Sequence, residues 1–195
     1  MSDQPAPQSL RTEAIEALLV ERKLLTPEDI DTVLTTFSEQ VGPMNGATLV
    51  ARAWTDEAFK TRLLEDATTI IQEYGFEGGQ VDKLVVKACT ESVHHVVVCT
   101  LCSCYPWAVL GLPPRWYKDP GYRSRIVREP RAVLQEMGLT LPETTAIKVW
   151  DSSAEIRYMV LPLRPPGLEA LDETALTALI TRDAMIGVAA IEQRA

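Results

Sequence analysis

Three cysteines lie within six residues of this chain, in the stretch VVVCTLCSCYPW at residues 96–107. The β-branched run before them is typical of a buried strand, so Cys99, Cys102 and Cys104 are expected in a tight loop where that strand ends. A loop this short cannot turn all three side chains into a hydrophobic core. The fold must therefore bring three thiols together, whereas Cys89, alone on another strand-like run, is interpreted as an ordinary core residue.

Composition excludes several classes of partner. The 195 residues, 46% of them hydrophobic, suffice for one ordinary domain with an appended segment. A formal net charge of -8 argues against nucleic acid and an anionic membrane surface as partners. The apolar runs are much shorter than the roughly 20 residues of a membrane span, and the N-terminal sequence does not resemble a secretory signal. We therefore expect a cytoplasmic protein, in which clustered thiols more often bind metal or catalyse than form disulfides.

The first third of the chain has the pattern of helices. Apolar residues from position 11 to about position 74 recur at helical spacing. Thr26 and Pro27 have the residue types of a helix N-cap and a first helical position. The following segment predicts two or three short helices, with breaks near Thr55 and Asp66.

The rest of the chain mixes strands with short helices. Strands are predicted for KLVVKA and HHVVVCT, and AIKVWDS and EIRYMVLP alternate like the two strands of a hairpin. Prolines allow only short helices in the central part of the chain. The remaining predicted elements are helices over residues 120–127, 130–137 and 172–183 and a final strand over residues 185–191.

Together these patterns predict an α+β fold. The character of the sequence changes at the glycine-containing segment GFEGGQ, where helical periodicity gives way to β-branched runs. We expect a helical N-terminal segment at residues 1–75, followed at residues 76–195 by a layered α-β-β-α domain that carries the cysteine loop.

A disulfide and a structural zinc site are two interpretations of the cysteine loop. A Cys99–Cys102 disulfide would match the C-x-x-C of thiol oxidoreductases, but the chain order is wrong for a thioredoxin-like protein and a third thiol is left over. Zinc can take a fourth ligand from Cys89, His94 or His95, although the sequence lacks the second, distant C-x-x-C of zinc ribbons. A zinc-binding interaction module therefore stays open as an alternative, and both histidines are otherwise interpreted as structural.

The cysteine spacing also permits a chelating claw for a transition metal. If Cys102 and Cys104 both bind through sulfur, the main-chain nitrogens of Ser103 and Cys104 lie between them, and all four atoms can share one plane. Cys99 can loop beneath this plane and supply an axial sulfur, which leaves the sixth position open for water or substrate. Thiolates favour late or borderline metals over magnesium and calcium, so the donor set suits such a metal.

The loop and its surroundings resemble a known family. The segments VCTLCSCYPW, VLGLPPRWYKDPGYRSRIVREPRAVLQEMG and EIRYMVLPLRPPG are similar to the α subunit of nitrile hydratase, from about residue 78 to the C-terminus. The resemblance implies a non-corrin metal held by Cys99, Cys102, Cys104 and the main-chain amides of Ser103 and Cys104. It also implies that Cys102 matures to a sulfinic acid and Cys104 to a sulfenic acid.

Within this family the chain resembles the cobalt type. Members divide between Co(III) and Fe(III), and Thr100 and Tyr105 match the cobalt pattern, whereas the iron type usually has Ser and Thr at these positions. Co(III) is therefore the expected metal, and Fe(III) is the alternative.

The resemblance implies an enzyme that hydrates a nitrile to its amide, with the trivalent metal as a Lewis acid. Cys104, as a sulfenate, would be the nucleophile or base beside the open position. Gln80 falls where the family keeps a polar residue near the centre, although a residue after two glycines is also typical of a surface turn. Trp107 matches an aromatic residue of the substrate pocket, although core packing explains such a residue equally well. Arg123 and Arg157 match positions interpreted as structural or as part of a subunit interface.

The resemblance also implies a partner chain and leaves the substrate open. Oxidised cysteines need positively charged partners, which in the family come from two arginines of a separate β subunit. No matching segment occurs in these 195 residues, so we expect full activity only with a β subunit. The same claw occurs in thiocyanate hydrolase and in the three-subunit, toyocamycin-type hydratase of nucleoside nitriles. A small nitrile, thiocyanate and a nucleoside nitrile are therefore all candidate substrates.

Overall fold

The computed structural model describes residues 7–36, 44–76 and 83–191. Contacts between Cα atoms divide the chain into two compact units, residues 1–40 and residues 41–195. The cysteine loop and every strand belong to the larger unit.

The smaller unit contains two helices, α1 (Pro7–Glu21) and α2 (Pro27–Thr35). The Thr26 hydroxyl accepts a hydrogen bond from the Asp29 backbone N–H at 3.1 Å, and the Asp29 carboxylate accepts one from the Thr26 N–H at 2.8 Å. This reciprocal capping box satisfies backbone donors that the first turn leaves free. The predicted N-cap at Thr26 and first helical position at Pro27 are confirmed.

Helices and strands alternate irregularly in the larger unit. Its elements are α3 (Met44–Thr55), α4 (Glu57–Glu65), α5 (Ala67–Glu73), β1 (Lys83–Ala88), β2 (Val93–Val98), α6 (Trp107–Leu110), the 3₁₀ helix η2 (Arg115–Lys118), α7 (Pro120–Arg125), α8 (Pro130–Glu136), β3 (Ala146–Asp151), β4 (Ile156–Leu161), α9 (Glu173–Leu179) and α10 (Arg182–Ile186). Asp56 and Asp66 cap α4 and α5, which confirms the predicted helix breaks near Thr55 and Asp66. The domain boundary predicted at residue 75 stays a prediction.

The strands within the described residues form two separate parallel pairs. β1 pairs with β4, which aligns Lys83 with Ile156, and β2 pairs with β3, which aligns Val93 with Ala146. The strands predicted for KLVVKA, HHVVVCT, AIKVWDS and EIRYMVLP are therefore confirmed. The predicted hairpin is wrong, because β3 and β4 follow each other in the chain but belong to different sheets.

The chain passes from one sheet to the other between β3 and β4. The Ser152 N–H still donates to the carbonyl of Val98, the last residue of β2, at 2.7 Å, whereas the Ser153 N–H donates to the Ile156 carbonyl at 2.9 Å and closes a turn. Alternating burial shows that a segment is a strand but not which strand lies beside it. Two strands in stacked sheets therefore give the same sequence pattern as two strands of a hairpin.

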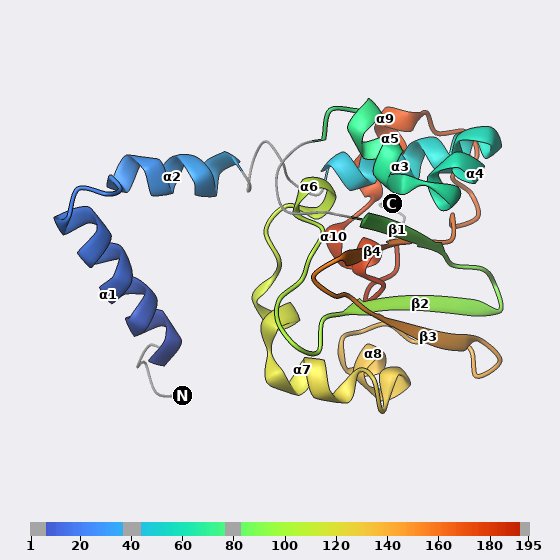
Figure 1. Ribbon diagram of the computed structural model, residues 1–195. Helices are drawn as coiled ribbons and strands as arrows, with labels where there is room; N and C mark the ends of the chain where they lie inside the picture. The colour runs from blue at the N-terminus through green and yellow to red at the C-terminus, as the bar shows by residue number, and fades with distance from the viewer. Residues whose placement is uncertain (1–6, 37–43, 77–82, 192–195) are drawn as a thin grey trace. The chain divides into compact units, whose positions relative to one another are not determined.

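Helices enclose the two sheets from both sides, as Figure 1 shows. α4 and α5 pack on β1, α9 packs along α3 in the same helical layer, and α8 packs on β3 at the opposite side. Buried side chains fill the space between the layers, among them Leu63, Ile70, Leu84, Val97 and Met159. The predicted α+β fold is therefore confirmed, and its layers follow the order α-β-β-α.

The predicted helix over residues 172–183 is two helices. Ile180 has an extended backbone between α9 and α10, with φ -81° and ψ 117°. The Thr181 hydroxyl then accepts a hydrogen bond from the Ala184 N–H at 3.2 Å and caps α10. A new N-cap after the break therefore starts a second helix.

The final strand predicted over residues 185–191 is wrong. Met185 and Ile186 belong to α10, which ends at Gly187, where φ is +92°. Met185, Ile186 and Val188 are buried by the packing of α10 on the sheets. The apolar run therefore reflects burial of a short helix and the turn after it.

Gly187 is expected to tolerate no side chain. A Cβ atom at this position would lie 2.0 Å from the His95 carbonyl oxygen of β2, and the positive φ is itself unfavourable for other residues. We expect Gly187→Ala to lower the free energy of unfolding by about 3 kcal/mol or more, measured by urea denaturation. Gly138→Ala is the matched control. Gly138 has φ +93° with no atom within 4 Å of the added Cβ, so only the backbone cost of about 1–2 kcal/mol applies. Equal losses in both variants would contradict the steric explanation.

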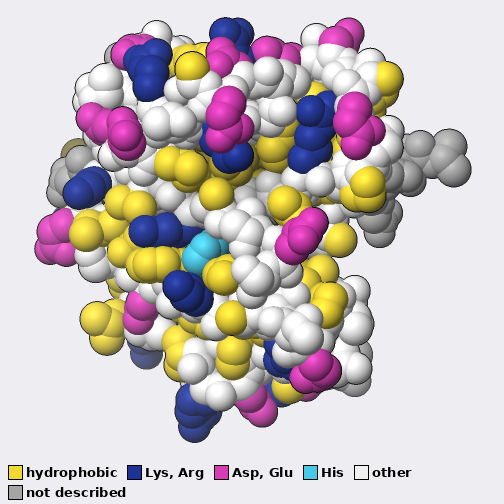
Figure 2. Space-filling model, turned by 90° about the vertical axis from the view of Figure 1, so that its right-hand side faces the viewer, with side chains coloured by type: hydrophobic (Ala, Val, Ile, Leu, Met, Phe, Trp, Pro, Cys, Tyr) yellow, Lys and Arg dark blue, Asp and Glu magenta, His cyan; other side chains and the backbone are white. Residues whose placement is uncertain are grey.

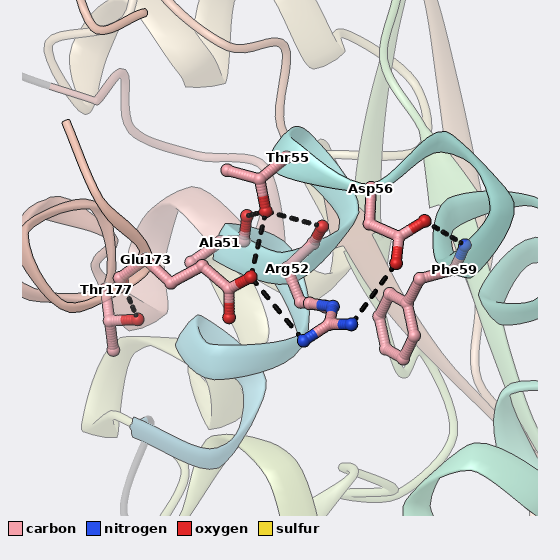
Figure 3. A network of polar contacts seen from close by, with 7 residues as sticks. All are labelled: Ala51, Arg52, Thr55, Asp56, Phe59, Glu173 and Thr177. Carbon is pink, nitrogen blue, oxygen red and sulfur yellow. Dashed lines mark hydrogen bonds and ion pairs between the residues drawn. The ribbon is translucent and has the colours of Figure 1, made fainter. Parts of the chain in front are cut away.

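A polar network joins α3 to α9 (Figure 3). Arg52 lies 3.3 Å from the Asp56 carboxylate and 3.6 Å from the Glu173 carboxylate, and the Thr55 hydroxyl donates to Glu173 at 3.1 Å. These groups are partly exposed to solvent, so the ion pairs contribute little stability. Their role is to fix how α9 lies on α3, while buried Leu176 supplies the packing.

The surface is mixed in character. In the part of the chain that the structure describes, no helix is long and apolar enough to cross a membrane. Figure 2 shows one face, on which hydrophobic side chains lie beside basic, acidic and histidine side chains.

Candidate metal centre

The cysteine loop begins where β2 ends. Residues 96–98 of β2 are buried, and Cys99, the next residue, has no exposed surface. Cys104 is half-buried and Cys102 is exposed, so the loop runs from the core to the surface. Trp107 then begins α6. A buried strand therefore fixes the inner end of the loop, and a helix fixes its outer end.

The three sulfur atoms form a compact cluster. Sγ of Cys102 lies 3.2 Å from Sγ of Cys99 and 2.8 Å from Sγ of Cys104, and all three atoms lie within 4.8 Å of one another. These separations exceed a disulfide bond of about 2.05 Å, and the cysteines are free thiols.

The sulfur separations also favour one ligand geometry. Two sulfurs bound at right angles, with metal–sulfur bonds of about 2.3 Å, lie about 3.3 Å apart, whereas tetrahedral ligands lie about 3.8 Å apart. The observed 3.2 Å and 2.8 Å are closer to the right-angle value. The residues therefore fit a metal that takes adjacent ligands in an octahedron or square better than they fit tetrahedral zinc.

Two side chains from the segment after the loop hold its backbone. Arg123 of α7 donates to the Cys99 carbonyl at 2.9 Å and to the Thr100 carbonyl at 2.6 Å. The Tyr117 hydroxyl of η2 donates to the Cys104 carbonyl at 3.0 Å. Carbonyl groups at both ends of the loop are thereby paired, which restricts the positions of the cysteines.

Asp151 attaches the loop to the neighbouring strand. Its carboxylate accepts hydrogen bonds from the Thr100 N–H at 2.9 Å and the Thr100 hydroxyl at 2.5 Å. Asp151 is the last residue of β3 and is aligned with Val98 of β2, so the parallel pairing brings it to the loop. Sequence reasoning missed Asp151 because it paired β3 with β4. The carboxyl ends of adjacent parallel strands meet at one edge, and this was the signal that could have found it.

Arg123 is expected to control how firmly the loop holds a metal. Arg123→Met leaves two carbonyl groups without their charged donor, at a cost of about 1.5–3 kcal/mol per hydrogen bond. We expect a lower melting temperature and faster loss of cobalt to a chelator. Arg128→Met is the control, because Arg128 is exposed and donates to the nearby Ser124 carbonyl, away from the loop backbone. Equal rates of cobalt loss in the two variants would show that the loop does not depend on Arg123.

The thiols of Cys102 and Cys104 differ strongly in acidity. Hydrogen bonds from the Cys104 and Cys99 thiols, assisted by the backbone N–H groups of Cys104 and Ser103, lower the pKa of the Cys102 thiol to about 7. Burial and the hydrogen bond to Cys102 raise the pKa of Cys104 to about 12. Because metal ligands must be thiolates, the lowered pKa makes Cys102 readier than Cys104 to bind a metal near neutral pH.

Arg157 of β4 lies close enough to the cluster for its charge to lower the pKa of Cys104, against the larger effect of burial. It is 7% exposed, and it donates through Nη1 to the Ser153 carbonyl. Its Nε is buried and has no hydrogen-bond partner within the described part of the chain. A buried guanidinium group with a free donor is a ready partner for an anionic group.

The predicted site residues are only partly covered by the structure. Cys99, Cys102 and Cys104 lie together, and Ser103 lies between two of them on the exposed side. Trp107 is half-buried and packs against the core beside the loop. Gln80 lies outside the described residues. The functional roles of these residues stay predictions.

The alternative fourth ligands of a zinc site lie elsewhere. Cys89 and His94 line a pocket near the start of β2, and His95 accepts a hydrogen bond from the Trp150 indole at 2.9 Å. Over the described residues, the group of potential ligands within 4.8 Å of one another consists of the three loop cysteines alone. Neither histidine joins the cluster.

Comparisons with known proteins identify the family. A family model described as nitrile hydratase, alpha chain matches residues 6–189. The chain belongs to this family. The low-molecular weight cobalt-containing nitrile hydratase subunit alpha of Rhodococcus rhodochrous is 53% identical over 178 residues, which cover 91% of this chain and 86% of that protein. Thiocyanate hydrolase subunit gamma of Thiobacillus thioparus is 41% identical over 187 residues, which cover 90% of this chain and 76% of that protein.

A solved structure of a family member has the same fold. A double mutant of the Fe-type nitrile hydratase from Comamonas testosteroni Ni1 superposes with a TM-score of 0.87 at 42% identity, covering 96% of this chain and 92% of that chain. The predicted membership of the nitrile hydratase alpha family is therefore confirmed.

Proposed function

We propose that this chain is the metal-binding subunit of a nitrile hydratase and hydrates a nitrile to the corresponding amide. In this proposal the metal is held by Cys99, Cys102 and Cys104 and by the main-chain amides of Ser103 and Cys104. The observation that supports it most is the cluster of three sulfurs, with 3.2 Å and 2.8 Å between neighbouring sulfur atoms, in a chain of this family.

The proposed metal is non-corrin Co(III). Thr100 and Tyr105 follow the cobalt pattern, and a relative named as cobalt-containing is 53% identical to this chain. Fe(III) is the alternative, because the Fe-type enzyme shares the fold at 42% identity. Bound Co(III) supplies a Lewis acid that polarises the nitrile or a water molecule without a redox change.

The residues of this chain then have distinct tasks. Cys102 is proposed to be a sulfinic acid and Cys104 a sulfenic acid, as the family resemblance implies. The sulfenate oxygen of Cys104 would attack the nitrile carbon or take a proton from the attacking water. Arg157 would stabilise the negative charge on that oxygen, because its buried charge already acts on the Cys104 sulfur.

Two further residues are proposed to shape the substrate site. Trp107 would contribute an aromatic wall, since it follows the loop closely and is half-buried. Gln80 would contribute a polar group, on the family resemblance alone.

Full activity is proposed to need a β subunit. Co-expression with that subunit, followed by assay of the complex and of this chain alone, tests the requirement. We expect the isolated chain to retain metal with weak turnover. Equal nitrile turnover by the isolated chain would refute the need for a partner.

The substrate is tested with a panel. A small aliphatic nitrile, a bulky heteroaromatic nitrile such as a nucleoside nitrile, and thiocyanate are compared as substrates of the same complex. Preference for thiocyanate would assign the chain to the thiocyanate hydrolase branch, which its 41% identity to subunit gamma keeps as the second candidate.

Metal analysis and intact mass distinguish the enzyme from a non-catalytic zinc module. We expect cobalt, with one singly and one doubly oxygenated cysteine. Zinc with three unmodified thiols would overturn the proposal, and iron would change only the metal. The proposed location is the cytoplasm, where such thiols escape disulfide formation, and fractionation of the native host tests it.

A further inference from the structure

A cavity lies at the opposite end of β2 from the cysteine loop. Its volume is about 480 Å³, and apolar side chains form most of its wall, including Leu139, Leu141 and Val160. Cys89 and His94 also line it. The five steps along the extended strand from His94 to Cys99 span roughly 16 Å, so this cavity is separate from the metal centre.

Cys89 and His94 face each other in this cavity. Sγ of Cys89 lies 3.8 Å from Nδ1 of His94, and Nε2 of His94 lies 2.8 Å from the Gly187 carbonyl oxygen. A carbonyl oxygen only accepts hydrogen bonds, so Nε2 must carry a proton. A neutral imidazole has a single N–H, and therefore Nδ1 presents its lone pair to the thiol. The Gly187 carbonyl thus selects the tautomer in which His94 acts as a base toward Cys89.

The sulfur atom has a further donor. The His95 backbone N–H donates to Sγ of Cys89 at 3.3 Å, which stabilises negative charge on sulfur. A nucleophile, a base, a group that orients the base and an N–H donor to the nucleophile are therefore all present at one cavity.

We propose that Cys89 is a nucleophilic site that adds covalently to small, uncharged Michael acceptors, with His94 as its general base. This site is independent of the metal and of the proposed hydration reaction. Burial raises the pKa of the Cys89 thiol and lowers the pKa of His94, so both groups are neutral before the reaction.

The addition needs no oxidant or cofactor. The thiol proton moves to Nδ1 of His94 while the sulfur lone pair forms a bond to the β carbon of the acceptor. The π electrons of the C=C bond move onto the α carbon and its activating group. His94 then returns the proton to the α carbon, which leaves a saturated thioether on Cys89.

The cavity wall predicts which acceptors react. Because the wall is mostly apolar, entry of an anion costs desolvation that few polar partners offset. Glu91, which also lines the cavity, adds repulsion of anions. Neutral acceptors are therefore expected to react much faster than anionic ones with the same reactive group.

The first test compares two maleimides on the full chain. N-ethylmaleimide and 3-maleimidopropionate carry the same reactive group with and without a carboxylate. Cleavage after Glu91 separates the Cys89 peptide from the loop cysteines, so mass spectrometry follows Cys89 alone. Relative to their rates with glutathione, we expect at least about a tenfold preference for N-ethylmaleimide at Cys89. The proposal would be overturned if the ratio of the two maleimide rates at Cys89 equalled their ratio with glutathione. It would also be overturned if Cys89 reacted in urea but not in the folded chain.

The second test uses two variants. His94→Gln removes the base and is expected to slow the reaction of Cys89 with N-ethylmaleimide by about a hundredfold. Ala189→Leu enlarges a side chain that lines the cavity while Cys89 and His94 stay in place, and it is expected to slow the reaction as well, with an unchanged melting temperature. Cys89→Ser should give no adduct on that peptide. An unchanged Cys89 rate in both His94→Gln and Ala189→Leu would show that neither the base nor the cavity governs reactivity.

Discussion

Cys99→Ser is expected to abolish cobalt retention. The rate of nitrile hydration should fall with it by more than about a thousandfold. Cys99 is fully buried at the end of β2, and its sulfur lies 3.2 Å from that of Cys102. A serine hydroxyl is a harder donor that keeps its proton near neutral pH, so it does not replace a thiolate on a trivalent late metal. Cobalt per chain, measured on the complex with the β subunit, and the rate of amide formation check this result.

Ser124→Ala is the control for this substitution. Ser124 is exposed on α7, and its hydroxyl donates to the nearby Gly121 carbonyl. It should retain one cobalt per chain and full activity. Full cobalt occupancy in Cys99→Ser would remove Cys99 from the ligand set and with it the proposed claw.

Arg157→Met is expected to lower kcat by about a hundredfold to a thousandfold while cobalt stays bound. The methionine roughly preserves the buried volume but removes the charge that acts on Cys104, so an anionic oxygen on that sulfur loses its partner. KM should change little, because the lost interaction concerns the reacting group and not substrate binding. Steady-state kinetics with metal analysis of the same sample separate these effects.

Arg131→Met is the matched control for Arg157→Met, because both substitutions remove an arginine that donates to backbone carbonyl groups. Arg131 donates to the carbonyls of Leu141, Pro142 and Thr145, far along the chain from the cysteine loop. It should lower stability but leave kcat per bound cobalt unchanged.

A rise in KM with unchanged kcat in Arg157→Met would assign Arg157 to substrate binding. Loss of cobalt would assign it to the structure of the metal site.

Local signals in the sequence were enough for most elements. Thr26 and Pro27 mark the start of α2, and Asp56 and Asp66 mark the breaks between α3, α4 and α5. The predictions that were wrong concern residues whose secondary structure depends on partners distant in the chain. The run at residues 185–191 is apolar because α10 packs on β2 and β4, and no local pattern distinguishes that from a strand.

The candidate site divides in the same way. Cys99, Cys102 and Cys104 are close in sequence, so any compact loop brings their sulfurs together. Asp151 and Arg157 are close to the loop only because β3 lies beside β2 and β4 follows in the adjoining sheet. Sequence reasoning gave Arg157 a structural or interface role because nothing in the chain around it indicates that its charge acts on Cys104.

The sequence by itself determined the thiol cluster, its soft-metal chemistry and the family, because these depend on residue types at short, fixed spacings. Only the tertiary structure decided the pairing of the strands. That pairing brings Asp151 to the loop backbone, and the buried site of Arg157 beside Cys104 follows from the stacking of the sheets. The tertiary structure also decided that Cys89 and His94 lie together in a cavity, where the Gly187 carbonyl contacts His94. The physical reason is that side-chain alternation fixes the faces of a strand, whereas its neighbours are chosen by burial across the whole core.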